Sequence, residues 1–192
     1  MGLQISKSRV EVAPKLVIRL TDILAQLGMP NAQFKFEINH QENYFSTGKD
    51  EIQLLFSANK GSDFGLLKKV ASGGEMSRIM LAVKSVLSAD TKLPTIIFDE
   101  IDTGISGEIA NKIAEIMKVM SKEMQILAIT HLPQIAAKGQ FHYKVFKTIK
   151  ENTTISEIKL LNSNDRILEI AEMLSGKNMS ESAVNHAKAL LN

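Results

Sequence analysis

Apolar residues recur with two different periods along the chain, and each change of period predicts a new element. Near the N-terminus they recur every three or four positions, which predicts one amphipathic helix that Gly28 and Pro30 end. Its apolar positions are Ala13, Leu16, Val17, Leu20, Ile23, Leu24 and Leu27. Pro14 fits the first turn of that helix, so we expect the residues before it to form a separate helical stub.

The next part of the chain alternates apolar and polar residues with a period of two, which is typical of half-buried strands. The alternating apolar positions are Phe34, Phe36 and Ile38, then Ile52, Leu54 and Phe56. The polar segment 46–50 between them predicts a hairpin loop. Segment 59–65, rich in Gly, Ser and Asp, predicts a second loop.

After Ser72 the pattern changes to long amphipathic segments alternating with short apolar runs. It predicts helices over about 74–89 and 107–120, each followed by an apolar run, 95–98 and 126–129. Such runs are typical of buried parallel strands. The helix-strand-helix-strand order therefore predicts an α/β fold with a parallel sheet and right-handed crossovers.

The last part of the chain predicts an antiparallel hairpin and two helices. The hairpin strands are 143–149 and 154–161, with the turn at Glu151 and Asn152. The helices cover about 165–174 and 180–190.

Composition excludes several classes of site. The 192 residues are 44% hydrophobic and 23% charged, as expected of one soluble globular domain. No cysteine is present, so disulfides, thiolate zinc sites and cysteine nucleophiles are excluded. A net charge of +2 predicts no strong attraction to nucleic acid, and the basic group Lys138, Lys144, Lys147 and Lys150 is typical of a solvated face. No signal peptide or membrane-spanning stretch is recognisable, so we expect a cytoplasmic protein without a membrane partner.

The segment Ser72-Gly73-Gly74-Glu75 has two interpretations. Ser72 and Glu75 have the spacing of a capping box at the start of a helix. That role leaves the two glycines unexplained, because glycine in the first turn costs up to about 1 kcal/mol relative to alanine. Bare N–H groups at a helix N-terminus bind anions, so Ser72, Gly73 and Gly74 are also candidates for a phosphate contact.

A second group of candidates follows the two apolar runs. Asp99 and Glu100 end the first run, and His131 ends the second. A carboxylate there can hold Mg²⁺, and its neighbour can activate a water molecule. The intervals from Gly74 to Asp99 and from Asp99 to His131 each fit one helix plus one strand, so the acidic pair and His131 should share the ligand-binding edge of the sheet. Ser106 is expected to cap the following helix, with Glu108 in its first turn.

Taken together, these residues resemble the ABC ATPase superfamily. The signature corresponds to Ser72-Gly73-Gly74-Glu75, the Walker B motif ends in Asp99-Glu100, the D-loop surrounds Asp102, and the switch histidine is His131. Segments 69–82, 98–107 and 130–137 are most similar to the SMC-like branch of bacterial DNA-repair and recombination ATPases. The resemblance covers most of the chain.

The resemblance implies a fold and a set of partners. It identifies the chain as the C-terminal lobe of an ABC/SMC-type head, with residues 1–30 as the base of a coiled-coil arm and 31–192 as the head part. It implies ATP and Mg²⁺ as cofactors. The implied partners are an N-terminal half carrying Walker A, a second head that dimerises through ATP, and DNA bound by the full-length protein. The implied location is the cytoplasm, in association with the nucleoid.

The resemblance also assigns roles to individual residues. Ser72, Gly73, Gly74 and Glu75 would meet the γ-phosphate of ATP bound by the opposite head. Asp99 would hold Mg²⁺ and Glu100 would be the general base. His131 would sense the γ-phosphate, and Asp102 would couple the two nucleotide sites.

One departure from the family is clear. The phosphate-binding pattern G-x-x-x-x-G-K-[ST] occurs nowhere in the sequence. We therefore expect an ATPase that is inactive as this isolated chain. The equivalent part of a transporter's ATP-binding subunit is one alternative, although Glu75-Met76-Ser77-Arg78 differs from the usual transporter signature. A non-catalytic interaction module with the same fold is the other alternative.

Overall fold

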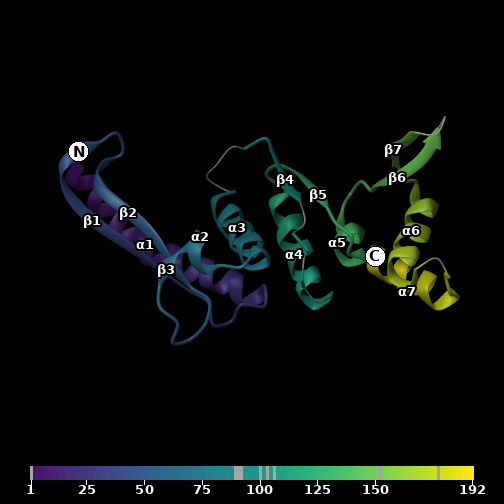
Figure 1. Cartoon of the computed structure of the whole chain (residues 1–192), viewed down its shortest axis with the longest axis horizontal. Helices are drawn as coiled ribbons and strands as arrows, with labels where there is room; N and C mark the ends of the chain where they lie inside the picture. The colour runs from purple at the N-terminus through teal and green to yellow at the C-terminus, as the bar shows by residue number, and fades with distance from the viewer. Residues whose placement is uncertain are drawn as a thin grey trace. The chain divides into compact units, whose positions relative to one another are not determined.

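The computed structural model describes residues 2–88, 93–99, 101–102, 104–105, 107–150, 153–176 and 178–192 (Figure 1). The chain divides into two compact units. The first comprises Met1–Ile96 with Glu123–Ile126, and the second comprises Ile97–Lys122 with Leu127–Asn192.

The first unit combines a long helix, an antiparallel sheet and a shorter helix. Helix α1 (Gly2–Gln26) contacts both strands of the hairpin formed by β1 (Gln33–Phe45) and β2 (Gly48–Ser57) (Figure 1). The short strand β3 (Gly65–Leu66) completes a sheet of order β1-β2-β3 and leads into α2 (Leu67–Val70) and α3 (Gly73–Leu87). The predicted hairpin is confirmed, and in its register Phe34 lies opposite Phe56.

The prediction that Pro14 begins a helix was wrong, because α1 is continuous from Gly2 and contains Pro14 in its interior. An interior proline removes one helix hydrogen bond, the one to the carbonyl of Val10. Val10 is 60% exposed, so water can reach this part of the helix. Ser6 and Arg9, in the first half of α1, both bind Asp50 of β2, and these contacts stabilise a segment that its own sequence does not mark as helical.

The apolar faces of α1, the hairpin and α3 form the core of the first unit. Leu24, Leu27, Phe56 and Ile79 are fully buried. The rings of Phe34 and Phe56 lie 5.3 Å apart at an interplanar angle of 49°. Burying each of these side chains stabilises the fold by about 1.5–3 kcal/mol, so the core fixes the position of α3, which carries the signature residues.

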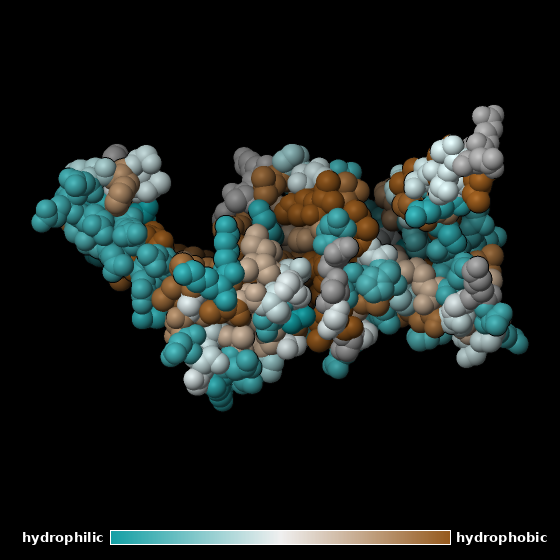
Figure 2. All heavy atoms as spheres, viewed as in Figure 1, coloured by the Kyte–Doolittle hydropathy of each residue, from teal (hydrophilic) through white to brown (hydrophobic). Residues whose placement is uncertain are grey.

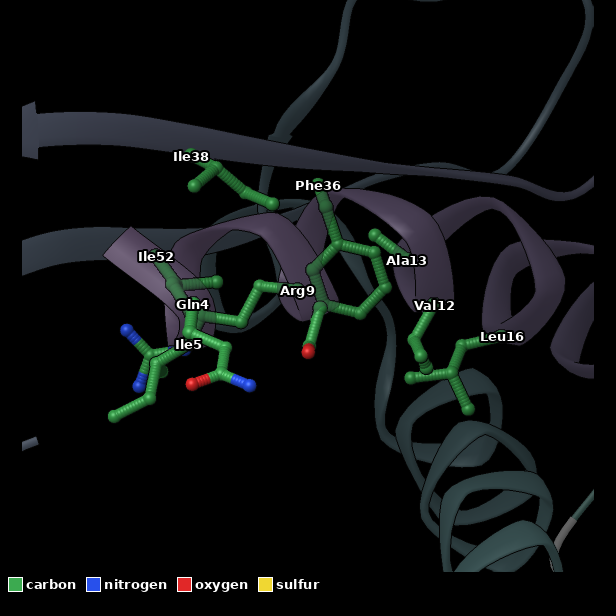
Figure 3. A pocket seen from close by; sticks show the side chains of 10 residues that line it. Gln4, Ile5, Arg9, Val12, Ala13, Leu16, Phe36, Ile38 and Ile52 are labelled. Atoms are coloured by element: carbon green, nitrogen blue, oxygen red, sulfur yellow. The ribbon is translucent and has the colours of Figure 1, made fainter. Parts of the chain in front are cut away.

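An apolar groove of about 570 Å³ lies between α1 and the hairpin (Figure 3). Figure 3 shows Val12 and Leu16 of α1 together with Phe36 and Ile38 of β1 and Ile52 of β2. Asp50 of β2 lies at the polar end of the contact between α1 and the hairpin. Its side chain is 1% exposed and accepts hydrogen bonds from Ser6 and Arg9. Helix and hairpin are therefore joined by a buried ionic contact as well as by apolar packing.

The α/β part of the chain follows α3. Strand β4 (Thr95–Asp99) and strand β5 (Gln125–Ile129) pair in a parallel sheet, and α4 (Gly107–Met120) connects them. Both strands begin in the first unit and end in the second. The predicted α/β order is confirmed, and Glu108 lies in the first turn of α4 as expected. Ser106, its predicted cap, lies outside the described residues.

The expectation that both apolar runs are buried strands was wrong. Phe98 is 8% exposed, but Ile97, Leu127 and Ile129 are 64%, 43% and 59% exposed. Figure 2 shows a brown, hydrophobic area on the surface over β4 and β5. Burial of a strand depends on which other segments cover it, and an apolar run alone does not specify them.

The remainder of the second unit consists of a hairpin and three helices. Helix α5 (Pro133–Lys138) contacts α4, α6 (Ser163–Ser175) and α7 (Glu181–Leu191), with a core around Ile170 and Ala187. Strands β6 (Tyr143–Lys150) and β7 (Thr153–Leu160) form the predicted hairpin, whose expected turn residues Glu151 and Asn152 lie outside the described residues.

Lys144, one of the four clustered lysines, is not free in solvent, because its ammonium binds the carboxylates of Glu169 and Glu172 on α6. Among the residues described, no helix combines the length and the apolar character that a membrane span requires.

Candidate functional site

The signature segment begins α3 with the predicted capping box. Ser72 is the N-cap residue with extended backbone angles, φ −69° and ψ 166°. Its Oγ accepts a hydrogen bond from the Glu75 N–H at 3.4 Å, and Glu75 Oε2 accepts one from the Ser72 N–H at 2.8 Å. The capping interpretation of these two residues is confirmed.

Capping leaves two N–H groups in the first turn of α3 without a helix partner. Gly73 and Gly74 occupy the first two helical positions, where no preceding carbonyl is available as an acceptor. A Cβ atom added to Gly73 would meet nothing within 4 Å, so its backbone borders open space. Bare N–H groups at the positive end of a 15-residue helix fit an anion such as a phosphate.

The second group of candidate residues centres on Asp102, whose side chain is 1% exposed. Its Oδ2 accepts hydrogen bonds from Thr130 Oγ1 at 2.5 Å and from the His131 backbone N–H at 2.8 Å. Thr130 Oγ1 in turn accepts the Leu132 N–H at 3.0 Å. The Asp102 carboxylate therefore holds three successive residues after β5: Thr130 and His131 directly, and Leu132 through the Thr130 hydroxyl.

The pKa of the Asp102 carboxyl lies below its ordinary value of 3.8. Burial is the largest influence and would raise this pKa, but the hydrogen bonds from Thr130 and from the His131 backbone together outweigh it. Asp102 is thus ionised at neutral pH although it is almost inaccessible to water. A buried charge of this kind holds its hydrogen-bond donors strongly.

The imidazole of His131 is attached to the same carboxylate. Its Nδ1 lies 3.1 Å from Asp102 Oδ2, while the side chain as a whole is 73% exposed. When Nδ1 donates to the carboxylate, Nε2 is left as the free ring nitrogen. The arrangement orients an exposed histidine without hiding the atom that could meet a ligand.

The acidic pair is described in part. Asp99 ends β4 and is exposed, whereas Glu100 and Thr103 lie outside the described residues. A carboxylate oxygen suits Mg²⁺, which commonly takes one or two carboxylates together with phosphates and water. Within the described part of the chain, no three His, Cys, Asp or Glu side chains form a group that could hold a metal ion. Asp99 fits Mg²⁺ as a single ligand.

The candidate residues fall into two groups. Ser72, Gly73, Gly74 and Glu75 belong to the first unit, and Asp99, Asp102 and His131 belong to the second. The structure brings Asp102 and His131 into contact, a pairing that the sequence order alone did not reveal.

Two further polar contacts were missed at the sequence level. The first is the hydrogen bond of Thr130 to Asp102, for which a hydroxyl residue directly before a histidine at a strand end was the available signal. The second is the cluster in which Ser6, Arg9 and His40 surround Asp50, and its members are far apart in the sequence.

Comparison with known proteins gives a consistent result. No protein-family model matches the chain. The DNA repair protein RecN of Deinococcus radiodurans is 44% identical over 191 residues, which are 100% of this chain and 33% of that protein. RecN of Rickettsia conorii is 43% identical over 191 residues, or 35% of its length, and RecN of Xylella fastidiosa strain 9a5c is 40% identical over 189 residues. The chain thus spans about a third of the length of these relatives and matches their C-terminal part.

Solved structures show the fold. The Smc head domain with a coiled coil and joint from Pyrococcus yayanosii has a TM-score of 0.62 at 18% identity, covering 86% of this chain and 30% of that one. The Smc head domain from Pyrococcus furiosus, bound to the C-terminal domain of ScpA, has a TM-score of 0.59 at 20% identity, covering 90% and 41%. The chain therefore has the fold of part of an SMC ATPase head and is similar, over its whole length, to the C-terminal third of the DNA repair protein RecN.

Proposed function

We propose that this chain provides the signature, Walker B and switch-histidine parts of a RecN-type ATPase head. The observation that carries the proposal is the first turn of α3, where a capping box holds Ser72 and Glu75 while Gly73 borders open space. This turn can contact a phosphate through backbone N–H groups. The relatives are named as DNA repair proteins, which favours DNA repair over transport. Within DNA repair, we propose double-strand-break repair and recombination as the process.

In this proposal ATP supplies the phosphoryl group, and Mg²⁺ neutralises its charge. Ser72, Gly73 and Gly74 bind the terminal phosphate held by an opposing head. Asp99 contributes one oxygen ligand for Mg²⁺, and Glu100 accepts the proton of the attacking water. His131 points its free ring nitrogen at the same phosphate.

Asp102 acts in this proposal as a positioning residue. Its side chain is buried, so it acts through the Thr130 hydroxyl and the His131 ring that it holds. Because one carboxylate fixes both the ring and the backbone of His131, movement of the D-loop segment around Asp102 would also move the histidine. This contact offers a route by which the D-loop couples two nucleotide sites.

The first proposed partner follows from the absence of a phosphate-binding loop pattern in the sequence, and the others follow from the similarity to RecN. A polypeptide with the Walker A half of the head would complete the nucleotide site, and a second head would close over the ATP. DNA would be bound by the complete protein, and we place that protein in the cytoplasm with the nucleoid.

The test is ATP hydrolysis by the chain alone and after mixing with the Walker A half of a RecN head. We expect negligible turnover alone and measurable turnover in the mixture. In the mixture, Glu100→Gln should lower turnover by about 10²–10⁴-fold, the usual contribution of a general base. Glu108→Gln is a matched control, since Glu108 is an acid in the first turn of α4.

Three results would contradict the proposal. Robust hydrolysis by the chain alone would mean that its nucleotide site is complete. A folded mixture without activity would favour the interaction-module alternative. Unchanged turnover in the Glu100→Gln mixture would remove Glu100 from the role of base.

A further inference from the structure

A small polar cavity of about 230 Å³ lies in the first unit, beside the start of α3. Three segments form its walls: the turn after α1, the loop after β2 and the first two turns of α3. The residues that line it are Gly28, Met29, Pro30, Asn31, Ala58, Asn59, Glu75 and Arg78. Unlike the groove beside α1, it is bordered mainly by groups that form hydrogen bonds.

Arg78 is the residue that points to a ligand. Its Nε is buried, and no residue that the structure describes forms a hydrogen bond or an ion pair with this guanidinium. A buried N–H without a partner is costly and calls for an explanation. An arginine presents five N–H donors in a rigid fork that matches phosphate and carboxylate oxygens.

Each wall of the cavity is fixed by its own hydrogen bonds. After α1, the Met29 N–H binds the Leu24 carbonyl at 2.9 Å and the Gly28 N–H binds that of Ala25, which is a Schellman ending. In the second wall, the hydroxyl of Ser57 lies 3.0 Å from the carbonyl oxygens of both Asn59 and Ser62.

The third wall is fixed by the capping box of α3. The cavity is therefore formed before any ligand arrives, which lowers the free-energy cost of binding.

The hydrogen-bonding side chains that line the cavity define the ligand. Arg78, Asn31 and Asn59 line the cavity from three different segments, and each of these side chains carries N–H donors. Donors from three directions suit a tetrahedral anion better than a planar carboxylate. Glu75 adds an acidic side chain, one of whose oxygens already binds the Ser72 N–H. Its other oxygen would repel an anion that has only acceptors, but it can accept a hydrogen bond from an anion that carries a proton.

We propose that the cavity lined by Asn31, Asn59, Glu75 and Arg78 binds a protonated phosphate group, either inorganic phosphate or the terminal phosphate of a nucleotide. Arg78 supplies the charge, the two asparagines orient the oxygens, and Glu75 accepts a hydrogen bond from the P–OH group. The site shares Glu75 with the signature segment, but it does not use the backbone N–H groups of Gly73 and Gly74, and it is tested by anion binding and not by ATP turnover. Sulfate, which has the same shape but no proton at neutral pH, would be rejected by Glu75.

The experiment follows the Nε–Hε signal of Arg78 by NMR while inorganic phosphate, sulfate or ADP is added to the 192-residue chain at constant ionic strength. We expect a saturable shift with phosphate and an affinity at least about tenfold weaker for sulfate. ADP tells apart the two possible sources of the phosphate group, inorganic phosphate and a nucleotide. If the cavity binds the terminal phosphate of a nucleotide, ADP should bind at least as tightly as inorganic phosphate.

Substitutions test the individual contacts, with phosphate affinity measured by calorimetry. Arg78→Gln should weaken phosphate binding by at least about tenfold, while Lys84→Gln, in the last turn of the same helix, should leave it unchanged. Glu75→Gln preserves the capping box and should bring the sulfate affinity close to that of phosphate, since glutamine can donate as well as accept.

Two outcomes would overturn the inference. One is a linear, unsaturated shift with every anion, which would mean general screening of charge. The other is equal affinity for phosphate and sulfate in the unsubstituted chain, a result that does not depend on whether any variant folds. Neither outcome touches the ATPase proposal, which is tested by turnover.

Discussion

At the residue scale, one buried carboxylate organises the candidate site of the second unit. Asp102 receives a hydroxyl, a backbone N–H and a ring nitrogen at a single oxygen, Oδ2. Hydrogen bonds to a charged acceptor contribute about 1.5–3 kcal/mol each, roughly twice as much as those to a neutral one. The order of the segment after β5 should therefore depend on the charge of Asp102 as well as on its shape.

Asp102→Asn tests this dependence. Asparagine keeps the shape of the side chain but removes the charge, so the hydrogen bonds of Thr130 and of the His131 N–H should weaken. We expect faster amide hydrogen exchange at His131 and a loss of about 1–3 kcal/mol in the free energy of unfolding. The exposed Asp63→Asn is the control and should change neither quantity. Unaltered exchange at His131 in Asp102→Asn would mean that this segment is ordered by its packing alone.

The sequence revealed the identity of the site residues better than their contacts. Ser72 and Glu75 could be paired in advance because a capping box is local, three residues from end to end. The contact of Asp102 with Thr130 and His131 was not predicted, because it joins residues almost thirty positions apart. Hydrogen bonds between distant segments follow from the folded geometry, which no local pattern encodes.

At the scale of elements, the contact between α1 and the β1–β2 hairpin depends on an ionised residue. The Arg9 guanidinium is the main cause that lowers the pKa of Asp50 from 3.8 to about 2, and hydrogen bonds from Ser6 and His40 add to it. A carboxyl with a depressed pKa stabilises the fold above its ordinary pKa, and this contribution is lost as the pH falls towards the folded-state value.

The pH dependence can be measured by thermal unfolding of the native chain and of Asp50→Asn. The difference in midpoint between them should be constant above about pH 5 and should shrink as the pH falls from about 4 towards 2. Asp22→Asn, an exposed change on the same α1, should give no such trend. A difference that stays constant down to about pH 2 would show that the charge of Asp50 does not stabilise the contact.

The elements themselves were predicted unevenly. Helices α3, α4, α6 and α7 and both hairpins have clear periods of 3.6 or 2, and the structure confirms them. The first half of α1 was misread, because it is polar and is held by the distant Asp50. Helix α5, a six-residue element, was not anticipated, because so short a segment shows no period.

At the scale of the whole molecule, exposed apolar side chains distinguish this chain from an ordinary globular domain. Ile97, Leu127 and Ile129 of β4 and β5 are each more than two-fifths exposed. The second hairpin has three apolar side chains with still larger exposed fractions, Val145, Ile149 and Ile158. Parallel strands are normally covered on both faces, so β4 and β5 should attract a covering surface.

We therefore expect the isolated chain to self-associate through β4 and β5. Sedimentation velocity should show a weight-average mass that rises with protein concentration, and mixing with the Walker A half should replace these species by a defined complex. Replacing Ile97, Leu127 and Ile129 together by threonine keeps β-propensity while removing apolar surface, so it should shift the chain towards monomer. The same change at Val145, Ile149 and Ile158 is the matched control. If the control reduces association equally, or if the native chain stays monomeric at all concentrations, the exposed face of β4 and β5 is not the contact surface.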